Sequence, residues 1–552
     1  MKRLTAIFIV IIALLAAFVG CSDPSNGTYQ PSAEEKDVSK VRAYSVPSGV
    51  AEYDGAEVYV GDIKLPVYSV QVNTSQTWSG NVFARKANGV CLFELDGIAK
   101  VTVKPNMQID YSSVMRPLSA KITPVADIEN NTVSLTFKSA GEYVLEINGD
   151  KHNAIHFFVS DYDDTDAAKY TGYDNIMVFE AGLHTAANDS RINGGNNNCI
   201  TIPSNTLVYL ADGAVVRGRF FAQSANNIGI AGRGIIDGSA FVRDATRNIV
   251  TVPIELNYCK NVLLEDFFAL DPAGWTLSAY FNEDVKINNI KIITSRSNGD
   301  GISIQSCKNV EVTGCFVRSW DDSLVVKNYP MWSDRNHYGE TENISFSDCT
   351  LWTDLAQSME IGYETVGEKF EKVSFDNITV LHALHLAVMS IHNANNAEIK
   401  NVSFRNITVE DGAIPAASGL LADFRVMYSS TWSDQHTAPT PLGNVDGVTV
   451  DNVKIVSAKK FSVLIGGCRD KRIGFESDHY VGNVKISNVS VGGVRPAYSD
   501  IAVSKTDEKY VYGLEFVQDD DTEVTGARFV LSQTAEKLSR YGGECNVTVV
   551  RP

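Results

Sequence analysis

A recurring β-strand motif constrains the fold of this chain more than any other feature of its sequence. Between residues 227 and 484, Asn, Asp, Lys or Gly followed by Val or Ile opens a β-favouring run at intervals of 34, 23, 25, 34, 29, 29, 46 and 36 residues. A single coil cannot bury its own apolar face, whereas stacked coils share one core. The repeat therefore predicts a right-handed parallel β-helix, with Asn side-chain ladders between coils. A doubly wound α/β fold is disfavoured because no amphipathic helices separate the strands.

The residues before the repeat indicate a second all-β domain. Residues 101–104 and 133–138 alternate apolar and polar side chains, and residues 143–147 run into Asn148-Gly149, a strong turn signal. No helical stretch interrupts them, so we expect a small antiparallel β-sandwich that ends near the acidic hinge at 161–164. The predicted organisation is a signal at 1–21, a linker at 22–40, the β-sandwich at 41–165 and a β-helix catalytic domain at 166–552.

The first residues read as a targeting segment. Lys2 and Arg3 precede an apolar run that ends at Gly20-Cys21-Ser22, which resembles a bacterial lipoprotein signal. We therefore expect lipidation at Cys21 and an exported protein on the periplasmic or cell-surface side of a membrane, held there only by the lipid. A plain secretory signal or a membrane anchor is the alternative.

The net charge and the spacing of the cysteines limit the classes of ligand that the chain is expected to bind. A formal net charge of −18 disfavours nucleic-acid binding, which needs basic patches, and an anionic polysaccharide would also be repelled at long range. None of the nine cysteines shows metal-ligand spacing, so no metal or cofactor is predicted. Cys315 and Cys349 share one phase of successive repeats, which favours buried ladder thiols over a disulfide. The oligomeric state does not follow from the sequence.

Three acidic residues carry the chemistry. Asp321 and Asp322 follow Asp300 by 21 and 22 residues, about one repeat, so stacked coils would bring all three together. Mutual repulsion can then split their pKa values into acid and base roles, as hydrolysis of a glycosidic bond requires. Neighbours on a regular strand face opposite ways, so Asp321 and Asp322 can share a cleft only at a bend or bulge. The alternative is a capped turn with two solvated carboxylates.

The surrounding motifs closely resemble glycoside hydrolase family 28, which includes the polygalacturonases. The resemblance covers about 200–410 and rests on Gly274-Trp275-Thr276, Asn298-Gly299-Asp300-Gly301, Ser306-Cys307-Lys308-Asn309-Val310 and the run from Asp321 to Lys327. A β-sandwich before the β-helix is more similar to the clan relative family 49, which includes dextranases. The resemblance implies an inverting mechanism in which Asp321 is the acid while Asp300 and Asp322 position and deprotonate water. It also implies substrate binding by Asn298 and Lys327.

Departures from family 28 bear on the substrate. Leu355-Ala356-Gln357 replaces the family's Gly-His-Gly, and Ser390-Ile391-His392 replaces the Arg-Ile-Lys that binds a uronate carboxylate. Gripping a carboxylate needs such cations. We therefore expect a neutral-sugar glycan, such as an α-glucan, with hydroxyls bound by Glu360 and Glu364 and with His392 in place of the missing cation.

Two longer intervals predict inserted loops whose aromatic residues either stack on sugar rings or cap the core. Residues 328–339 carry Tyr329, Trp332, Arg335 and His337, and residues 412–444 carry Arg425, Trp432 and His436. The sequence thus predicts an inverting hydrolase of a polysaccharide or oligosaccharide. The alternatives are a polygalacturonase-type pectic hydrolase, a polysaccharide lyase with a calcium site, and a non-catalytic glycan-binding β-helix.

Overall fold

The chain divides into two compact units, Met1–Val72 with Arg85–Lys169 and Asn73–Ala84 with Tyr170–Pro552. The computed structural model describes residues 40–73, 77–78, 81–82, 84–164, 166–242, 251–328, 338–367, 369–411, 420–430, 432–433, 439–456, 461–492, 501–506, 510–517 and 547–548. The predicted lipidation site and several loop residues lie outside these ranges: Cys21, Tyr329, Trp332, Arg335, His337 and His436. Within the described ranges, no helix has the length and apolar character needed to cross a membrane.

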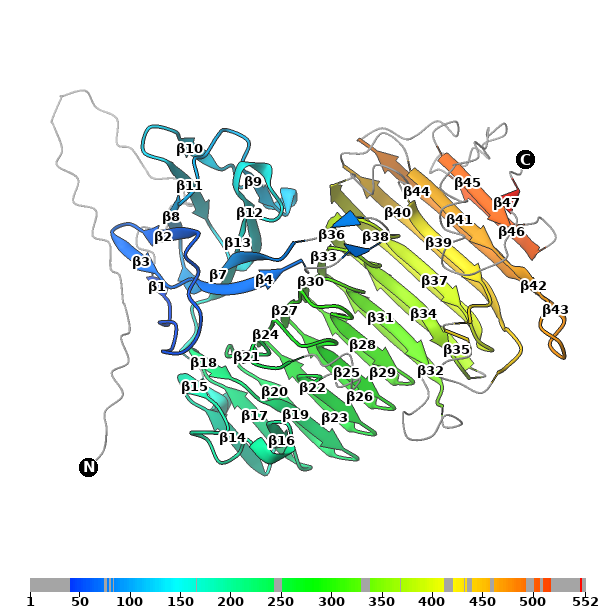
Figure 1. Cartoon of the computed structure of the whole chain (residues 1–552), viewed down its shortest axis with the longest axis horizontal. Helices are drawn as coiled ribbons and strands as arrows, with labels where there is room; N and C mark the ends of the chain where they lie inside the picture. The colour runs from blue at the N-terminus through cyan, green and yellow to red at the C-terminus, as the bar shows by residue number, and fades with distance from the viewer. Residues whose placement is uncertain are drawn as a thin grey trace, which may run out of the picture. The chain divides into compact units, whose positions relative to one another are not determined.

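The first unit contains two sheets that share one core (Figure 1). Phe137 contacts Phe93 and Phe157 of the opposite sheet, with ring centroids 5.8 and 5.1 Å apart. This arrangement is the predicted β-sandwich, but the unit is not purely antiparallel as expected, because residues 155–161 pair in parallel with residues 89–95. One sheet contains β1 (Lys40–Arg42), β4 (Tyr68–Val72), β7 (Lys86–Asp96), β9 (Val114–Arg116), β12 (Gly141–Glu146) and β13 (Ala154–Asp161). The other contains β2 (Ala56–Val60), β3 (Ile63–Leu65), β8 (Ala99–Pro105), β10 (Val125–Asp127) and β11 (Thr132–Phe137).

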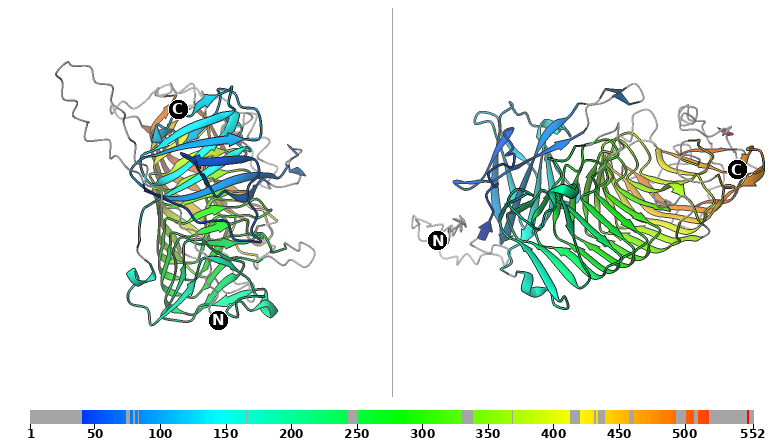
Figure 2. Two further views of the ribbon diagram at one scale, coloured as in Figure 1. Left: turned by 90° about the vertical axis from the view of Figure 1, so that its left-hand side faces the viewer. Right: turned by 60° about the horizontal axis from the view of Figure 1, so that its bottom comes forward.

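The second unit is a stack of coils whose strands pair almost entirely in parallel (Figure 2). Its larger sheet contains β14 (Asn175–Phe179), β15 (Gly182–His184), β17 (Thr206–Leu210), β18 (Ala214–Val216), β20 (Asn226–Ala231), β21 (Ile235–Asp237), β23 (Lys260–Glu265), β24 (Phe268–Leu270), β26 (Glu283–Asn288), β27 (Lys291–Ile293), β29 (Lys308–Thr313), β30 (Phe316–Ser319), β32 (Thr341–Ser347), β33 (Thr350–Thr353), β35 (Lys369–Asp376), β36 (Thr379–Ala383), β38 (Glu398–Asp411), β40 (Asn444–Ile455), β44 (Val481–Val491) and β46 (Val511–Val517).

The smaller sheet of the second unit carries the candidate site. It contains β16 (Cys199–Thr201), β19 (Arg219–Gln223), β22 (Ile254–Asn257), β25 (Leu277–Tyr280), β28 (Ile302–Gln305), β31 (Leu324–Asn328), β34 (Met359–Thr365), β37 (Met389–Asn393), β39 (Leu420–Val426), β41 (Phe461–Gly466), β45 (Ile501–Thr506) and β47 (Val547–Thr548). Minor elements are the strand pairs β5 (Thr77–Trp78) with β6 (Asn81–Val82) and β42 (Cys468–Asp470) with β43 (Ser477–His479), and the 3-10 turns η1 (Leu118–Ala120), η2 (Ile147–Gly149), η3 (Ala167–Lys169) and η4 (Gly194–Asn196).

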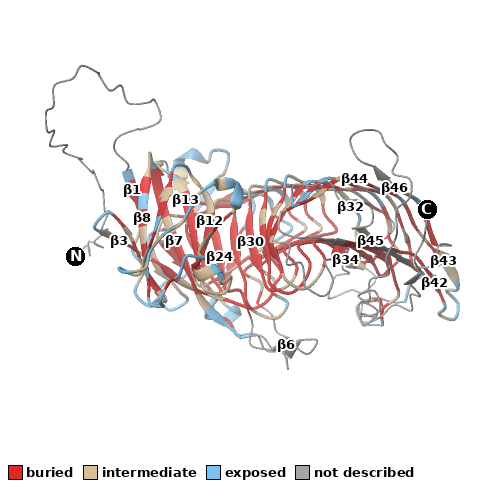
Figure 3. Ribbon diagram, turned by 90° about the horizontal axis from the view of Figure 1, so that it is seen from above, coloured by how far each residue is buried: buried red, intermediate tan, exposed pale blue. Residues whose placement is uncertain are grey.

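Alternation along the smaller sheet decides which side chains reach the core. Ile302, Leu324, Met359 and Met389 occupy one register position of successive strands and belong to the continuous hydrophobic core. Buried residues run along the strands in Figure 3. Because successive side chains point to opposite faces, the residues next to these point away from the core, and the site residues of β34, β37 and β39 are among them.

The predicted fold class, an all-β chain with a β-sandwich followed by a right-handed parallel β-helix, is confirmed. The predicted amide ladder is present: Asn343 Nδ2 donates to Asn309 Oδ1, and Asn309 Nδ2 to Asp284 Oδ1, each at 3.0 Å. These residues adopt positive φ angles, which Asn and Asp tolerate at turns. Cys315 and Cys349 are buried free thiols, as predicted.

Candidate active site

Asp300, Asp321 and Asp322 come together where two successive coils turn into the smaller sheet. Asp300 lies just before β28, and the aspartate pair lies in the bend between β30 and β31. The residues on both sides of Asp300 bond to the pair: the Asp321 amide donates to the Gly299 carbonyl at 3.2 Å, and the Gly301 amide to the Asp322 carbonyl at 2.9 Å. Because residues 320–323 are a bend rather than a strand, the rule of opposite faces does not apply to the pair.

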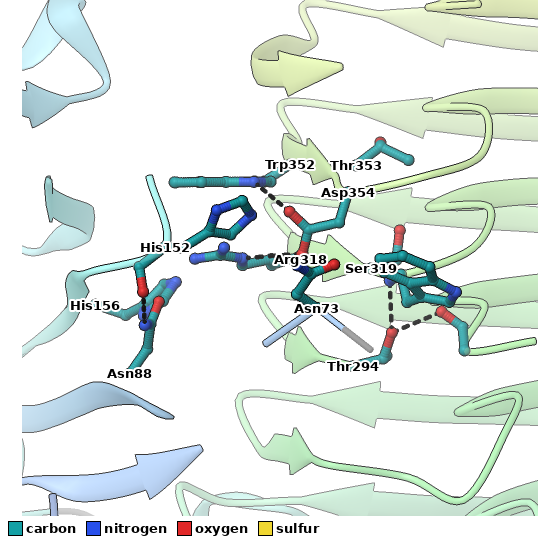
Figure 4. A network of polar contacts seen from close by, with 12 residues as sticks. Asn73, Asn88, His152, His156, Thr294, Arg318, Ser319, Trp352, Thr353 and Asp354 are labelled. Carbon is teal, nitrogen blue, oxygen red and sulfur yellow. Dashed lines mark hydrogen bonds and ion pairs between the residues drawn. The ribbon is translucent and has the colours of Figure 1, made fainter. Parts of the chain in front are cut away.

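Two buried hydroxyls hold this bend. Thr294 Oγ1 donates to the Gly299 carbonyl at 2.6 Å and accepts from the Trp320 amide at 2.8 Å (Figure 4). Ser319 Oγ donates to the Asp321 carbonyl at 2.7 Å. One side chain thus ties the turn before Asp300 to the bend of the aspartate pair. This fixes the backbone of all three acidic residues.

Burial differs among the three carboxyl groups. Asp300 and Asp322 are 2% and 7% exposed, whereas Asp321 is only partly buried. Burial raises the pKa of Asp300 to about 7; the Asp321 and Glu364 carboxylates add to this rise, and Lys327 opposes it. Burial, with the nearby Asp321 and Asp300 charges, also raises the pKa of Asp322 well above its usual range. The cluster therefore retains a proton near neutral pH.

Lys327 is the cation of this cluster. Its Nζ lies 3.4 Å from Asp300 Oδ2 and 3.7 Å from Glu364 Oε2, and it lies 5.2 Å from the centre of the Trp275 ring. Burial lowers the pKa of Lys327, but the surrounding carboxylates outweigh burial and raise it well above its usual range. Lys327 is therefore a fixed positive charge shared by two acids. Asn298, which lies two residues before Asp300 in the same turn, is exposed.

The segment at 354–358 contains Leu355-Ala356-Gln357, which the sequence resemblance aligns with the Gly-His-Gly of family 28. Arg318 and Asp354 form a fully buried ion pair at its start, with Nε 3.4 Å from Oδ2, and Trp352 Nε1 donates to the other Asp354 oxygen at 3.0 Å (Figure 4). From this anchored segment the Gln357 amide donates to Asp322 Oδ1 at 3.2 Å. A backbone amide thus contacts the carboxylate in this chain.

Glu360, His392, Asp423 and Arg425 form a buried network on the next coils, hereafter the charge network. His392 Nδ1 lies 2.8 Å from Glu360 Oε1, and its Nε2 lies 3.1 Å from Asp423 Oδ2. Ser390 Oγ donates to the other oxygen of Glu360. Arg425 donates from Nε and Nη2 to both oxygens of Asp423, at 2.6 and 2.7 Å. The polar atoms of Glu360 and His392 are thus occupied within the protein.

His392 and Asp423 of this network are both charged near neutral pH. Burial lowers the pKa of His392, but Glu360 and Asp423 outweigh it and raise it to about 9. Burial raises the pKa of Asp423, but Arg425 and His392 outweigh it and lower it to about 2. The prediction that Arg425 lies in an inserted loop is wrong, because Arg425 is a strand residue of β39 and is 4% exposed.

A bulge in β34 presents two further residues. Val326 pairs with Ile361 and Asn328 pairs with Thr365, so the single residue between them on β31 faces three on β34. The bulge begins at Gly362, whose φ of +119° favours glycine and where an added Cβ would lie 2.2 Å from the His392 carbonyl oxygen. Sequence reasoning overlooked Tyr363 within this bulge.

Asp423 was also missed, although Asp423 and Arg425 show the same i, i+2 spacing as Ser390 and His392. That spacing on a strand places side chains on one face and was the available signal. The site as a whole combines carboxyl groups of different burial with a fixed cation, an arrangement that suits general acid–base chemistry. Among the described residues, no group of three or more His, Cys, Asp or Glu side chains is arranged to hold a metal ion.

Comparison with known proteins agrees with this geometry. Residues 196–416 match Glycosyl hydrolases family 28. A probable polygalacturonase from Vitis vinifera is 22% identical over 242 residues, which are 43% of this chain and 45% of that protein. The chain thus matches less than half the length of this relative. The family match confirms the predicted resemblance and identifies this region as one of glycoside-hydrolase type.

Solved structures are similar to this chain. Dex49A from Penicillium minioluteum superposes with a TM-score of 0.51 at 14% identity, covering 86% of this chain and 96% of that one. A hyperthermoactive exopolygalacturonase from Thermotoga maritima gives a TM-score of 0.45 at 17% identity, covering 63% and 85%. The similarity to Dex49A extends over both units of the chain, which agrees with the predicted plan of a β-sandwich followed by a β-helix.

Proposed function

We propose that this chain is an inverting glycoside hydrolase that cleaves a neutral-sugar glycan, such as an α-glucan. One observation carries the substrate class: each cation of the described site already has carboxylate partners. Lys327 lies between Asp300 and Glu364, His392 between Glu360 and Asp423, and Arg425 is bidentate on Asp423. The proposal includes export and a lipid anchor at Cys21, as the first residues predict.

The charge balance of the site favours an uncharged sugar. The site gathers six carboxyl groups against three cations. A uronate bound here would bring a further negative charge. Among the described residues of the site, each cation already has carboxylate partners, so desolvating that charge would cost several kcal/mol. A hydroxymethyl group needs only hydrogen bonds, which carboxylates accept readily.

The catalytic roles follow from burial and access. An inverting hydrolase needs one carboxyl that protonates the leaving oxygen and a carboxylate opposite that activates water. We assign the acid to Asp321, because it is the most exposed of the three and an approaching glycosidic oxygen can reach it. Asp300 and Asp322, which are buried beside it, hold and deprotonate the water.

The first test measures reducing-sugar release from a panel that includes dextran, other neutral α-glucans, xylan and polygalacturonate. We expect release from a neutral glycan and weak or no release from polygalacturonate. Proton NMR of the first-formed product should show the anomer opposite to the cleaved linkage, because a water enters from the face opposite the leaving group.

Other results would select the alternatives. Efficient cleavage of polygalacturonate would contradict the neutral-sugar assignment and favour the activity named for the grape relative. An unsaturated product would indicate a lyase. Retention of the anomeric configuration at early times would contradict the inverting mechanism. Glycan binding without product from any substrate would indicate a non-catalytic β-helix.

Replacing Lys327 should move the pH profile. Asp300 must be ionised to activate water, so activity should rise with pH through about 7, the pKa that Asp300 has beside Lys327. Lys327→Met removes the charge that lowers this pKa, so the acidic limb of kcat/KM should move to higher pH. Lys286→Met, at an exposed lysine of β26, is the matched control and should leave the profile unchanged. A folded Lys327→Met enzyme with the wild-type acidic limb would exclude this role.

A further inference from the structure

Tyr363 and Trp432 form an aromatic pair in front of the charge network. The Tyr363 ring lies flat on the His392 imidazole, with centroids 4.2 Å apart and an interplanar angle of 7°. The Tyr363 and Trp432 rings form a T-shaped pair, with centroids 5.5 Å apart and an interplanar angle of 80°. Geometries of this kind stabilise aromatic pairs beyond their buried area.

Neighbouring buried residues hold both aromatic side chains in place. Both ring nitrogens of His392 are engaged by Glu360 and Asp423, so the imidazole under Tyr363 has one fixed orientation. The turn that carries Trp432 is anchored separately, because Ser433 Oγ donates to the Ala394 carbonyl at 2.5 Å. A preformed aromatic surface loses little side-chain entropy when a ligand binds.

The charge network and the aromatic pair differ in their exposure to solvent. Glu360, His392 and Arg425 are at most 4% exposed, whereas Tyr363 and Trp432 are only partly buried. The next residue after Tyr363 is Glu364, which is also partly exposed and lies 3.7 Å from Lys327 Nζ. The aromatic surface therefore adjoins the catalytic cluster directly, and the charges lie behind it.

We propose that Tyr363 and Trp432 form the wall of a sugar-binding subsite beside the catalytic carboxylates, with His392 as a positioning residue for Tyr363. This inference rests on the proposed function and gives its substrate a specific contact. The C–H face of a neutral sugar ring packs on an aromatic face, and the phenol hydroxyl can donate to or accept from a sugar hydroxyl. Neither contact supplies a positive charge to a uronate carboxylate, so this wall gives a uronate no advantage over a neutral sugar.

The test measures binding and turnover separately. Tyr363→Ala should raise KM by about 10- to 100-fold, the order of effect found when one aromatic partner of a stacked nucleobase is removed. The kcat should change by less than about threefold, because the ring binds sugar without entering the proton transfers. Tyr363→Phe keeps the ring and should remain within about fivefold of wild type. Tyr111→Ala, at an exposed tyrosine of the first unit, is the control.

Calorimetry in an Asp321→Asn background tests the wall without catalysis. The probes are an isomaltooligosaccharide and a galacturonic-acid oligomer of equal length. Loss of affinity on adding Tyr363→Ala supports the subsite, whichever oligomer binds. Affinity and KM unchanged by Tyr363→Ala, or no binding of either oligomer to the Asp321→Asn protein, overturns it. If the galacturonate oligomer binds and is cleaved while Tyr363→Ala weakens it, the proposed substrate fails and the subsite stands.

A double variant tests the positioning role of His392. His392→Gln alone should raise KM, because Tyr363 loses its flat support. In the Tyr363→Ala background the same change should add no further rise, because its effect passes through the missing ring. An additive effect on KM, or an effect confined to kcat, would contradict a role exerted through Tyr363.

Discussion

Asp321→Asn should lower turnover by about 10²- to 10⁴-fold, the usual contribution of a general acid. The amide has nearly the same size as the carboxyl group but cannot give a proton to the leaving oxygen. The main-chain bond from the Asp321 amide to Gly299 does not involve the side chain, so the bend should persist. Initial rates on the glycan that the wild type cleaves measure the effect, and circular dichroism confirms the fold.

Asp284→Asn is the matched control for this prediction. Asp284 is exposed on β26 of the other sheet and accepts from Asn309 in the amide ladder, where Asn occurs at the same position in neighbouring coils. The same chemical change there should leave turnover within about twofold of wild type. If Asp321→Asn also retained near wild-type turnover, Asp321 would have no part in the mechanism, and the proton would have to come from Asp300 or Asp322.

The fold could be predicted because the positions that repeat in the sequence are the positions that pack in each coil. A β-helix needs apolar residues at fixed positions of each coil and a turn residue at another. The pattern around Asn309 and Asn343 therefore predicts both the strands and the way they stack. The proximity of Asp300 to Asp321 and Asp322 followed from the same repeat interval. The bend that turns both aspartates toward one site did not, because it depends on two further contacts: Thr294 accepts from a main-chain amide one coil away, and Ser319 donates to a main-chain carbonyl within the bend.

Other parts of the site could not be predicted from spacing. Tyr363 reaches the surface because β34 bulges at Gly362, and one bulge changes the register of every residue after it. Arg425 was expected in a loop because the interval to the next motif is long, but β39 lies within that interval and pairs with β37. The spacing between two repeat motifs shows how many residues are inserted, but it does not show where the next strand begins.

Arg425→Met should lower the free energy of unfolding by about 3–5 kcal/mol, the cost of leaving one partner of a buried ion pair uncompensated. In the native protein two anions, Glu360 and Asp423, balance two cations, His392 and Arg425, all within the charge network. Methionine fills a similar volume but leaves a net buried negative charge. Denaturant titration followed by tryptophan fluorescence measures the loss. Arg405→Met, at an exposed arginine of β38, should stay within about 0.5 kcal/mol of wild type.

The pH dependence and a double variant separate this electrostatic cause from simple loss of packing. Arg425 and His392 lower the pKa of Asp423 to about 2, below its ordinary value of about 3.9. The stability that this shift supplies is complete above pH 4 and disappears as the pH falls toward 2, so the deficit of Arg425→Met should shrink over that range. Asp423→Leu combined with Arg425→Met removes both charges and should recover much of the stability at neutral pH. A deficit that stays constant with pH and is not recovered by the second substitution would show that Arg425 stabilises the coil through packing alone.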